Sequence, residues 1–310
     1  MSTWAVLGDG TWGRALAGRI AAGGATVRLV GLGLPAGPLP SGVEGGADVR
    51  AALAETERVL VAVPISALDG LLRQAAPAFE GHHRVVTTAR GLTAGDLPRR
   101  ATELVLSATC VRQTGVLAGA ADAEAVESGH PVAVVVGSAF PGWAREIQAA
   151  LSGARMRVYT NNDPVGVELA NALAPLLAVA LGAARALGVG AASEATALTR
   201  AMAEMDRLVQ RLGGRAGTAH GLAGLGVLVD LALEARSSAF DAGRALSSGD
   251  RAAGDRWPEL RDNARGLALR ANLAGIRAPM LETVAAMFEG RVDAAEALST
   301  LMSRAARAED

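Results

Sequence analysis

Hydrophobic and polar positions divide the chain into two halves with different periods. In the first half, short apolar runs that suit buried strands alternate with amphipathic runs of helical period. The strands predicted from these runs are Trp4–Leu7, Thr26–Val30, Val59–Val63, Val85–Ala89, Thr114–Leu117, Val132–Gly137 and Arg157–Tyr159. The helices predicted between them are Arg14–Ala22, Ser66–Ala75 with Ser66 as its cap, Asp96–Leu106 and Gly142–Leu151. This alternation predicts the α/β class, with a Rossmann-like, doubly wound parallel sheet.

The pattern changes near Asn161. Asp163 and Pro164 suit the N-cap and first turn of a helix. Only helical periods follow, and they predict Val165–Leu187, Ser193–Leu212, Leu228–Leu246, Trp257–Ala274, Met280–Phe288 and Val292–Arg307, with breaks at Gly188–Ala192 and Gly213–Gly226. We therefore expect two domains, a Rossmann domain at residues 1–160 and an all-helical C-terminal domain at residues 161–310.

A glycine-rich turn links the first predicted strand to the first predicted helix. It reads Gly8-Asp9-Gly10-Thr11-Trp12-Gly13. In this setting Gly8 permits the turn, Gly10 lets the backbone approach a pyrophosphate, and Gly13 lets the helix pack closely on the strand. The free N–H groups at the helix start would then face the phosphates of a dinucleotide. The alternative is a glycine turn that packs well and binds nothing.

The end of the second predicted strand lacks a side chain that would bind the adenosine ribose of the dinucleotide. The strand ends Val30-Gly31-Leu32-Gly33, without the acid typical of NAD sites or the arginine typical of NADP sites. Gly31–Gly46 is rich in glycine and proline and predicts a loop. The expected cofactor is therefore NAD or NADP, with no preference between them.

Charge and composition exclude several classes of protein. A formal net charge of −1 gives no electrostatic case for binding nucleic acid or an anionic membrane, and we find no uninterrupted apolar run of the ~20 residues that a membrane span needs. Cys110 is the single cysteine, which leaves no internal disulfide and no cysteine metal cluster, and we expect a buried thiol there. Met1-Ser2-Thr3 leads directly into the first strand, so we expect a cytoplasmic protein. We also expect no metal site.

All 30 basic residues are arginines. Arginine stays protonated in proteins, so it cannot accept a proton, whereas a desolvated lysine can act as a general base.

Several segments together carry a resemblance to one family. They are Val6–Ala17 around the glycine turn, Val61–Pro64, Tyr159–Leu169, Leu198–Met205, Gly221–Gly226, Ala278–Glu282 and Leu301–Arg304. In this order, over nearly the whole length, they resemble the NAD(P)-dependent glycerol-3-phosphate dehydrogenases of the soluble bacterial type. The resemblance implies a Rossmann domain, a helical substrate and dimerisation domain, and a homodimer. It also implies cofactor contacts at Gly8, Gly10, Thr11, Trp12, Gly13, Pro64, Ala123 and Glu259.

The positions that carry the family's chemistry have changed. The resemblance places a Lys-Asn pair, whose lysine is the proton acceptor, at Ala174-Pro175. A second site lysine falls on Arg90, and the aspartate that orients the proton acceptor falls on Val227.

The substrate-binding segments have changed as well. A Ser-Arg-Asn phosphate clamp falls on Ser237-Ser238-Ala239, and a Gly-Pro-Thr loop falls on Gly119-Ala120-Ala121. The substrate-pocket candidates that remain are Arg90, Gly119, Ala121, Ser237 and Ser238.

Oxidation of an alcohol requires a group that takes the hydroxyl proton as hydride leaves, and such a group contributes about 10²–10⁴-fold. Ala174 and Pro175 carry none. We therefore predict a divergent, inactive relative that still binds NAD(P) and an unidentified small molecule, with no catalytic residue assigned.

Two other hypotheses remain open. One is an NAD(P)-dependent oxidoreductase that acts on glycerol 3-phosphate or on a different, less anionic substrate. For the less anionic substrate, the pocket would be lined by Ala120, Ala121, Ala174, Val227 and Ala239. Its proton donor would be of another kind, with His220 or the pair Asp230 and Glu234 as candidates. The other is a structural dimer that has also lost dinucleotide binding.

Overall fold

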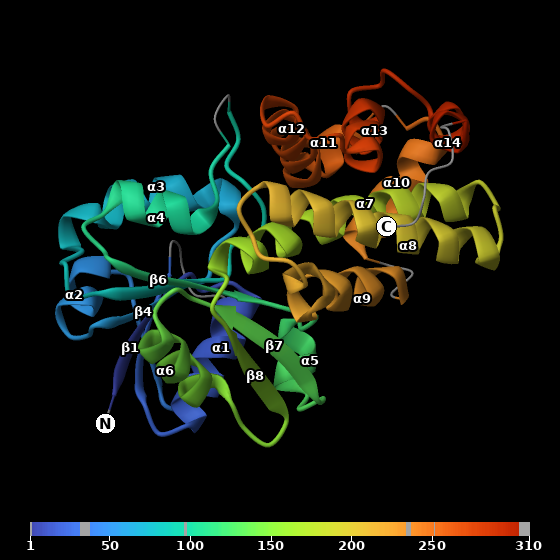
Figure 1. Ribbon diagram of the computed structural model, residues 1–310. Coiled ribbons are helices and arrows are strands. Elements are labelled where there is room, and N and C mark those ends of the chain that lie inside the picture. Colours follow the sequence, from blue (N-terminus) through green and yellow to red (C-terminus); the bar gives the residue numbers. More distant parts are fainter. Residues whose placement is uncertain (1, 32–37, 96–97, 234–236, 251, 304–310) are drawn as a thin grey trace. The chain divides into compact units, whose positions relative to one another are not determined.

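The computed structural model describes residues 2–31, 38–95, 98–233, 237–250 and 252–303 (Figure 1). The chain forms two compact units. The first consists of Met1–Thr93 and Arg99–Asn171, and the second of Ala94–Pro98 and Ala172–Asp310. The sequence analysis places the boundary between residues 160 and 161, whereas the units divide inside helix α7 (Pro164–Ala186).

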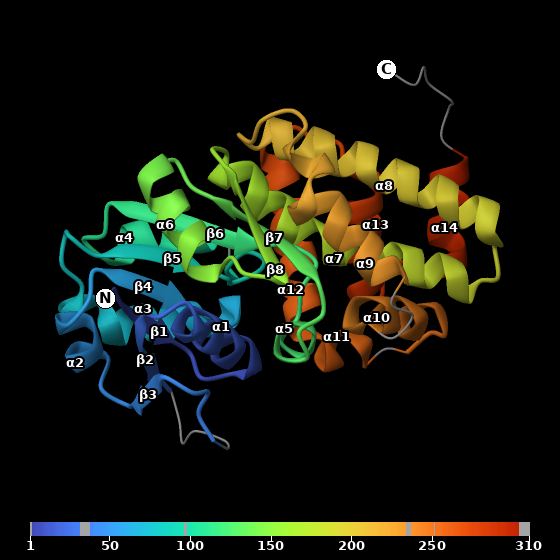
Figure 2. The ribbon, with the colours of Figure 1, turned by 90° about the horizontal axis from the view of Figure 1, so that it is seen from below.

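The first unit is built on one eight-stranded sheet with the order β3-β2-β1-β4-β5-β6-β7-β8, which Figure 2 shows from below. The first six strands have the Rossmann order. All neighbouring strands are parallel except β6 and β7, which are antiparallel. The strands are β1 (Thr3–Leu7), β2 (Thr26–Val30), β3 (Val43–Gly46), β4 (Arg58–Val61), β5 (Arg84–Thr87), β6 (Gln113–Ala118), β7 (Val132–Gly137) and β8 (Met156–Asn161).

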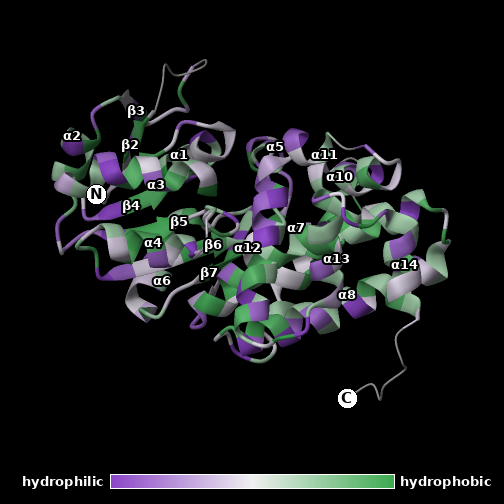
Figure 3. Cartoon of the chain, turned by 90° about the horizontal axis from the view of Figure 1, so that it is seen from above, coloured by the Kyte–Doolittle hydropathy of each residue, from purple (hydrophilic) through white to green (hydrophobic). Residues whose placement is uncertain are grey.

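Helices cover both faces of this sheet (Figure 1). One face carries α1 (Thr11–Ala22) and α6 (Pro141–Leu151), and the other carries α2 (Val49–Ala54), α3 (Ile65–Ala75) and α4 (Ala101–Ala108). Short segments η1 (Ala76–Ala78) and α5 (Ala123–Glu127) complete the unit. The central strands carry apolar side chains on both faces, because successive side chains face opposite clusters. In β4, Leu60 packs with the α1 and α6 side, and Val59 and Val61 with the other. The hydropathy colours of Figure 3 show the strands as mostly hydrophobic.

A pair of tryptophans fills the core on the α1 and α6 face. The rings of Trp4 and Trp143 stack with their centroids 5.5 Å apart. The indole N–H of Trp143 donates to the carbonyl of Val85 at 3.3 Å, which satisfies its polar edge. These two side chains are the largest fully buried ones among the described residues.

The strands and the α/β class predicted from the sequence are confirmed, and four local predictions in this unit are wrong. Val43–Gly46 forms edge strand β3 inside the expected loop, whose residues 32–37 lie outside the described part of the chain. Helix α3 has Pro64, not Ser66, at its N-cap. Helix α4 starts at Ala101, because the Glu103 carboxylate accepts the N–H of Arg100 at 2.8 Å and closes the first turn there.

Cys110 is the fourth correction, since the cysteine is exposed rather than buried. Its Sγ donates to the carbonyl of Phe79 at 3.1 Å.

The second unit is entirely helical over its described residues. After the C-terminal part of α7 it contains α8 (Ala191–Arg211), α9 (Val227–Leu233), α10 (Ser238–Ser247), α11 (Ala253–Arg256), α12 (Pro258–Leu273), α13 (Pro279–Phe288) and α14 (Ala294–Met302). A 3₁₀ turn, η2 (Thr218–His220), and a π-helical turn, η3 (Leu222–Gly226), precede α9. The single helix predicted at Leu228–Leu246 is wrong, because Ser237 caps a new helix by accepting the N–H of Phe240.

Helix α7 combines length with an apolar composition. Pro164–Ala186 is long and apolar enough to cross a membrane, which the sequence analysis did not expect, but 89% of its most apolar window is buried in the protein. Burial against protein explains its hydropathy, as in the central helix of a soluble protein.

A buried carboxylate joins α8 to the start of α13. Glu204 is 2% exposed, and its two oxygens accept the N–H groups of Met280 and Leu281 at 3.0 and 2.9 Å. These are first-turn donors of α13, so Glu204 caps that helix from a distance. Burial raises the pKa of Glu204 above its ordinary value, and the two N–H groups and Arg207, 3.9 Å away, oppose the rise.

This raised pKa predicts a pH dependence of stability. The folded protein holds the Glu204 proton more tightly than the unfolded chain, so the free energy of unfolding falls as pH rises from about 4.5. In Glu204→Gln this fall is removed, so the stability of the variant relative to the parent increases with pH. Urea unfolding between pH 4.5 and 7.5 measures the difference, with exposed Glu127→Gln as the control. Parallel curves for Glu204→Gln and the parent would contradict the assignment.

Candidate functional site

A small cleft in the first unit collects residues from several strand ends. It has a volume of about 40 Å³. Its walls come from the start of α1, the segment after β5, the end of β6, the middle of β7 and helix α7, and they comprise Trp12, Thr88, Arg90, Leu117, Ala118, Gly119, Ala121, Val134 and Asn171. The carboxyl ends of parallel strands are where α/β folds bind ligands. The structure thus brings together four residues that the sequence analysis named, Trp12, Arg90, Gly119 and Ala121.

The glycine turn between β1 and α1 is built by close contacts. A Cβ on Gly8 would lie 2.4 Å from the carbonyl oxygen of Ala62, and the φ of Gly8 is +117°. A Cβ on Gly13 would lie 2.0 Å from the carbonyl oxygen of Gly8. Neither position accepts a side chain, so these two glycines are required by packing alone.

Gly10 differs from its neighbours in this turn. It is the N-cap of α1, and a Cβ built on it would meet no described atom within 4 Å. No side chain caps this end of the helix, and its first turn, all of it described, contains no acid. A 12-residue helix with open space before its first N–H groups suits a pyrophosphate. The residues present therefore fit an NAD(P) dinucleotide, which would be held by the N–H groups of α1.

Arg90 and Gly119 define the rim and wall of the cleft. Arg90 is exposed and follows β5, where its guanidinium can attract an anion but cannot accept a proton. Gly119 follows β6 with a φ of +144°, and a Cβ there would lie 2.9 Å from the Cα of Val134. This close approach narrows the cleft between β6 and β7.

Helix α7 is fixed in the first unit by Glu168. This side chain is 1% exposed. Its carboxylate accepts the N–H of Thr102 at 2.9 Å, the hydroxyl of Thr102 at 2.6 Å and the guanidinium of Arg100 at 3.1 Å. Burial raises the pKa of Glu168, against the effect of Arg100 and Thr102. Asn171 lies three residues later, on the same side of α7, and is thereby directed into the cleft.

The positions on which the resemblance places catalytic groups are apolar and buried. Ala174 on α7 is 0% exposed, Val227 at the start of α9 is 1% exposed, and Ala239 in α10 is 1% exposed. Pro175 lies inside α7. Of the residues on which the resemblance places a phosphate clamp, Ser237 is used as a helix cap and Ser238 is exposed at the first turn of α10.

Other residues named from the sequence lie elsewhere in their units. Pro64 is the N-cap of α3, Ala123 begins α5, and Glu259 is exposed in the first turn of α12. Thr11 is exposed at the start of α1. Their role as cofactor contacts stays a prediction.

The candidate proton donors lie in the second unit. His220 has its Nδ1 3.6 Å from Oδ1 of Asp206, and its side chain is 56% exposed. Asp230 is exposed on α9, and Glu234 lies outside the described residues. Among the described residues, no group of three or more His, Cys, Asp or Glu side chains could hold a metal ion.

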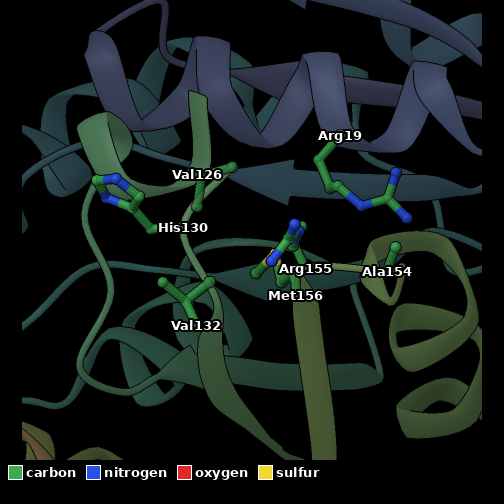
Figure 4. A pocket seen from close by; sticks show the side chains of 7 residues that line it. All are labelled: Arg19, Val126, His130, Val132, Ala154, Arg155 and Met156. Carbon is green, nitrogen blue, oxygen red and sulfur yellow. The ribbon is translucent and has the colours of Figure 1, made fainter. Parts of the chain in front are cut away.

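A second cavity, of about 220 Å³, shares no lining residue with the cleft beside the glycine turn (Figure 4). It is lined by Arg19, Val126, His130, Val132, Ala154, Arg155 and Met156. Arg19 extends from α1, and its Nε donates to the carbonyl of Leu151 at 3.0 Å. Although this cavity is the larger, it contains none of the residues that the sequence analysis named, and we place the candidate site in the smaller cleft beside the glycine turn.

Comparison with known proteins decides the family. The model of the NAD-dependent glycerol-3-phosphate dehydrogenase N-terminus matches residues 31–144, and that of the C-terminus matches residues 163–299. The chain belongs to the glycerol-3-phosphate dehydrogenase family. It is 37% identical to the glycerol-3-phosphate dehydrogenase [NAD(P)+] of Cereibacter sphaeroides, over 96% of this chain and 97% of the relative. It is 35% identical to that of Alkalilimnicola ehrlichii, over 96% of both chains.

Solved structures agree with this family. The glycerol-3-phosphate dehydrogenase of Coxiella burnetii superimposes with a TM-score of 0.88 at 29% identity, over 98% of this chain and 99% of that one. The family resemblance inferred from the sequence is confirmed. The expectation of NAD or NADP is confirmed at the level of the family, since the relatives carry NAD(P)+ in their names.

Asn171 is the most polar of the cleft residues that sequence reasoning missed. The signal was a single amide within the apolar run Leu169-Ala170-Asn171-Ala172-Leu173. It has no partner residue in a recognisable spacing, so only the fold shows that it faces a cleft.

The open space at Gly10 predicts that a substitution there weakens NADH binding without lowering the stability of the fold. Gly10→Ala keeps an allowed φ of −63° and meets no atom, so the melting temperature stays unchanged. The added methyl group stands where the pyrophosphate would approach, and NADH affinity falls about tenfold, since forced overpacking costs on the order of 1–3 kcal/mol. Titration with NADH, followed by tryptophan fluorescence, measures the affinity. Gly70→Ala, at a similarly open position in α3, is the control. Equal NADH affinity for Gly10→Ala and the parent would exclude a pyrophosphate here.

Proposed function

We propose that this chain is a family member that binds NAD(P) in its first unit and does not interconvert glycerol 3-phosphate and dihydroxyacetone phosphate at dehydrogenase rates. The observation that carries this proposal is Ala174, which occupies the proton-acceptor position of the resemblance and is fully buried on α7. A methyl group neither accepts nor donates a proton, and no lysine is present anywhere in the chain to replace it.

The binding half of the proposal is supported by the glycine turn. Gly8 and Gly13 maintain its backbone, and Gly10 keeps open space before the first N–H groups of α1. When bound, the dinucleotide would supply hydride chemistry, and the helix N-terminus would neutralise part of its pyrophosphate charge.

Loss of the phosphate clamp supports reduced substrate binding. Ser237 accepts an N–H of its own helix, and Ala239 contributes only a buried methyl group. Charge-assisted hydrogen bonds of a clamp arginine and asparagine would each contribute about 1.5–3 kcal/mol to phosphate binding. Without them, Arg90 is the basic residue in the described lining of the cleft.

A second candidate function is an oxidoreductase that acts on a less anionic substrate. It is favoured by the cleft itself, which retains a hydrogen-bonding amide at Asn171 among apolar walls. Its proton donor would be of another kind, and His220, whose Nδ1 lies 3.6 Å from Oδ1 of Asp206, is a candidate by residue type. We further propose a cytoplasmic homodimer that binds neither nucleic acid nor membranes, which the net charge of −1 and the burial of α7 support.

Turnover tests the proposal directly. With dihydroxyacetone phosphate and NADH or NADPH, the rate should lie about 10²–10⁴-fold below that of an active relative, because a positioned proton donor is missing. NADH oxidation followed at 340 nm measures the rate, with the Cereibacter sphaeroides enzyme as the positive control. Ordinary dehydrogenase rates would refute the proposal, and oxidation of NADH by neutral ketones would favour the second candidate. Absence of NADH binding in the fluorescence titration would leave a structural role.

Restoring the proton acceptor gives the complementary test. Ala174→Lys with Pro175→Asn should raise turnover of dihydroxyacetone phosphate at least tenfold over the parent, within the range that a positioned general acid contributes. Ala178→Lys, at a buried position one turn further along α7, is the control for the effect of a new lysine and should give no gain. A parent that is already as fast as the restored variant would contradict the assignment of Ala174.

A further inference from the structure

Asn171 presents an unused hydrogen-bond acceptor inside the cleft. Its side chain is 2% exposed, and its Oδ1 is buried with no hydrogen-bond partner among the described residues. Buried polar atoms in folded proteins almost always have a partner. The partner of this oxygen is therefore a group that the described part of the chain does not supply.

The walls of the cleft leave this oxygen available. Leu117, Ala118 and Val134 carry no side-chain donor, and no hydrogen bond reaches Oδ1 from Trp12 or Thr88. The volume of about 40 Å³ leaves room beside this oxygen for a small group of a ligand, because about 10–15 Å³ of such space already holds one water.

The backbone of Asn171 is unusual too. Pro175 lies four residues later in α7 and has no N–H, so the helix ladder provides no donor for the carbonyl of Asn171. One residue thus places two acceptors, a side-chain amide oxygen and a carbonyl, outside the regular hydrogen bonding of the helix.

We propose that Asn171 is a specificity-determining residue of the cleft, whose Oδ1 accepts a hydrogen bond from a hydroxyl group of a small anionic ligand. Arg90, exposed at the rim, attracts the anionic end, and the amide inside the cleft selects the hydroxyl. A ligand without the hydroxyl leaves the buried acceptor unpaired and binds less tightly. This inference rests on the proposed function, because it concerns the ligand that would lie beside the dinucleotide.

Two phosphates of similar size test the proposal. Glycerol 3-phosphate carries hydroxyl groups, and n-propyl phosphate does not. We expect the parent protein to bind glycerol 3-phosphate about fivefold more tightly by calorimetry, the effect of one neutral hydrogen bond. In Asn171→Leu, which has a similar size and no acceptor, the two phosphates bind equally.

The thermal stability of the same variant separates ligand binding from a structural role. Removal of an unpaired buried oxygen leaves the melting temperature unchanged or raises it. Asn171→Ala repeats the binding comparison without the bulk of leucine. Ser138→Ala is the matched control, because Ser138 is 1% exposed and its hydroxyl donates to the carbonyl of Thr114 at 2.7 Å. It should lower the melting temperature and keep the preference for glycerol 3-phosphate.

Each outcome either supports the proposal or overturns it. Loss of the preference in both Asn171 variants, without loss of stability, supports the proposal. The proposal is overturned if the preference for glycerol 3-phosphate survives in both variants, or if the parent shows no preference. It is also overturned if the melting temperature falls while the preference is intact, because a bound water or the protein would then satisfy Asn171. NADH binding is titrated separately, so a parent that discriminates between the phosphates but binds no NADH refutes the proposed function and leaves the role of Asn171 intact.

Discussion

The buried carboxylate of Glu168 is the interaction on which the arrangement of the cleft depends. A charged group this deeply buried is stable only when donors surround it. Thr102 and Arg100 supply three hydrogen bonds from the start of α4 and the residue before it. Because these donors come from one side, they fix the rotation of α7 about its axis within the first unit. That rotation determines that Asn171 lines the cleft.

The architecture could be predicted from the sequence because it follows from local patterns. Val132–Gly137 is a short run rich in β-branched valine, which favours a buried strand, and the structure confirms it as β7. Its direction was not predictable, because a strand antiparallel to β6 and one parallel to it have the same apolar pattern. Strand β3 was missed for the opposite reason. Val43-Glu44-Gly45-Gly46 has little strand propensity, and its pairing with β2 supplies the structure instead.

The candidate site was predictable only in part. Gly8, Gly10 and Gly13 are adjacent in the chain, so their spacing carries the information. Trp12, Arg90 and Gly119 belong to segments far apart, and the family resemblance rather than any local pattern connected them before the fold did. Asn171 had neither kind of signal. Its meaning comes from two facts of packing, the anchor at Glu168 and the missing partner of Oδ1, which periodicity does not encode.

The three glycines of the turn differ in what they report about the history of this protein. Gly8 and Gly13 are held by collisions with the chain's own backbone, so selection for a stable fold would preserve them in a descendant that had abandoned its nucleotide. Gly10 has no such internal constraint. Alanine there would be sterically silent, and random substitution should erode this position first once the ligand is gone. Among homologues that have lost catalysis, glycine at position 10 therefore indicates continued selection for dinucleotide binding. Another residue there indicates that only the fold of the turn has been kept.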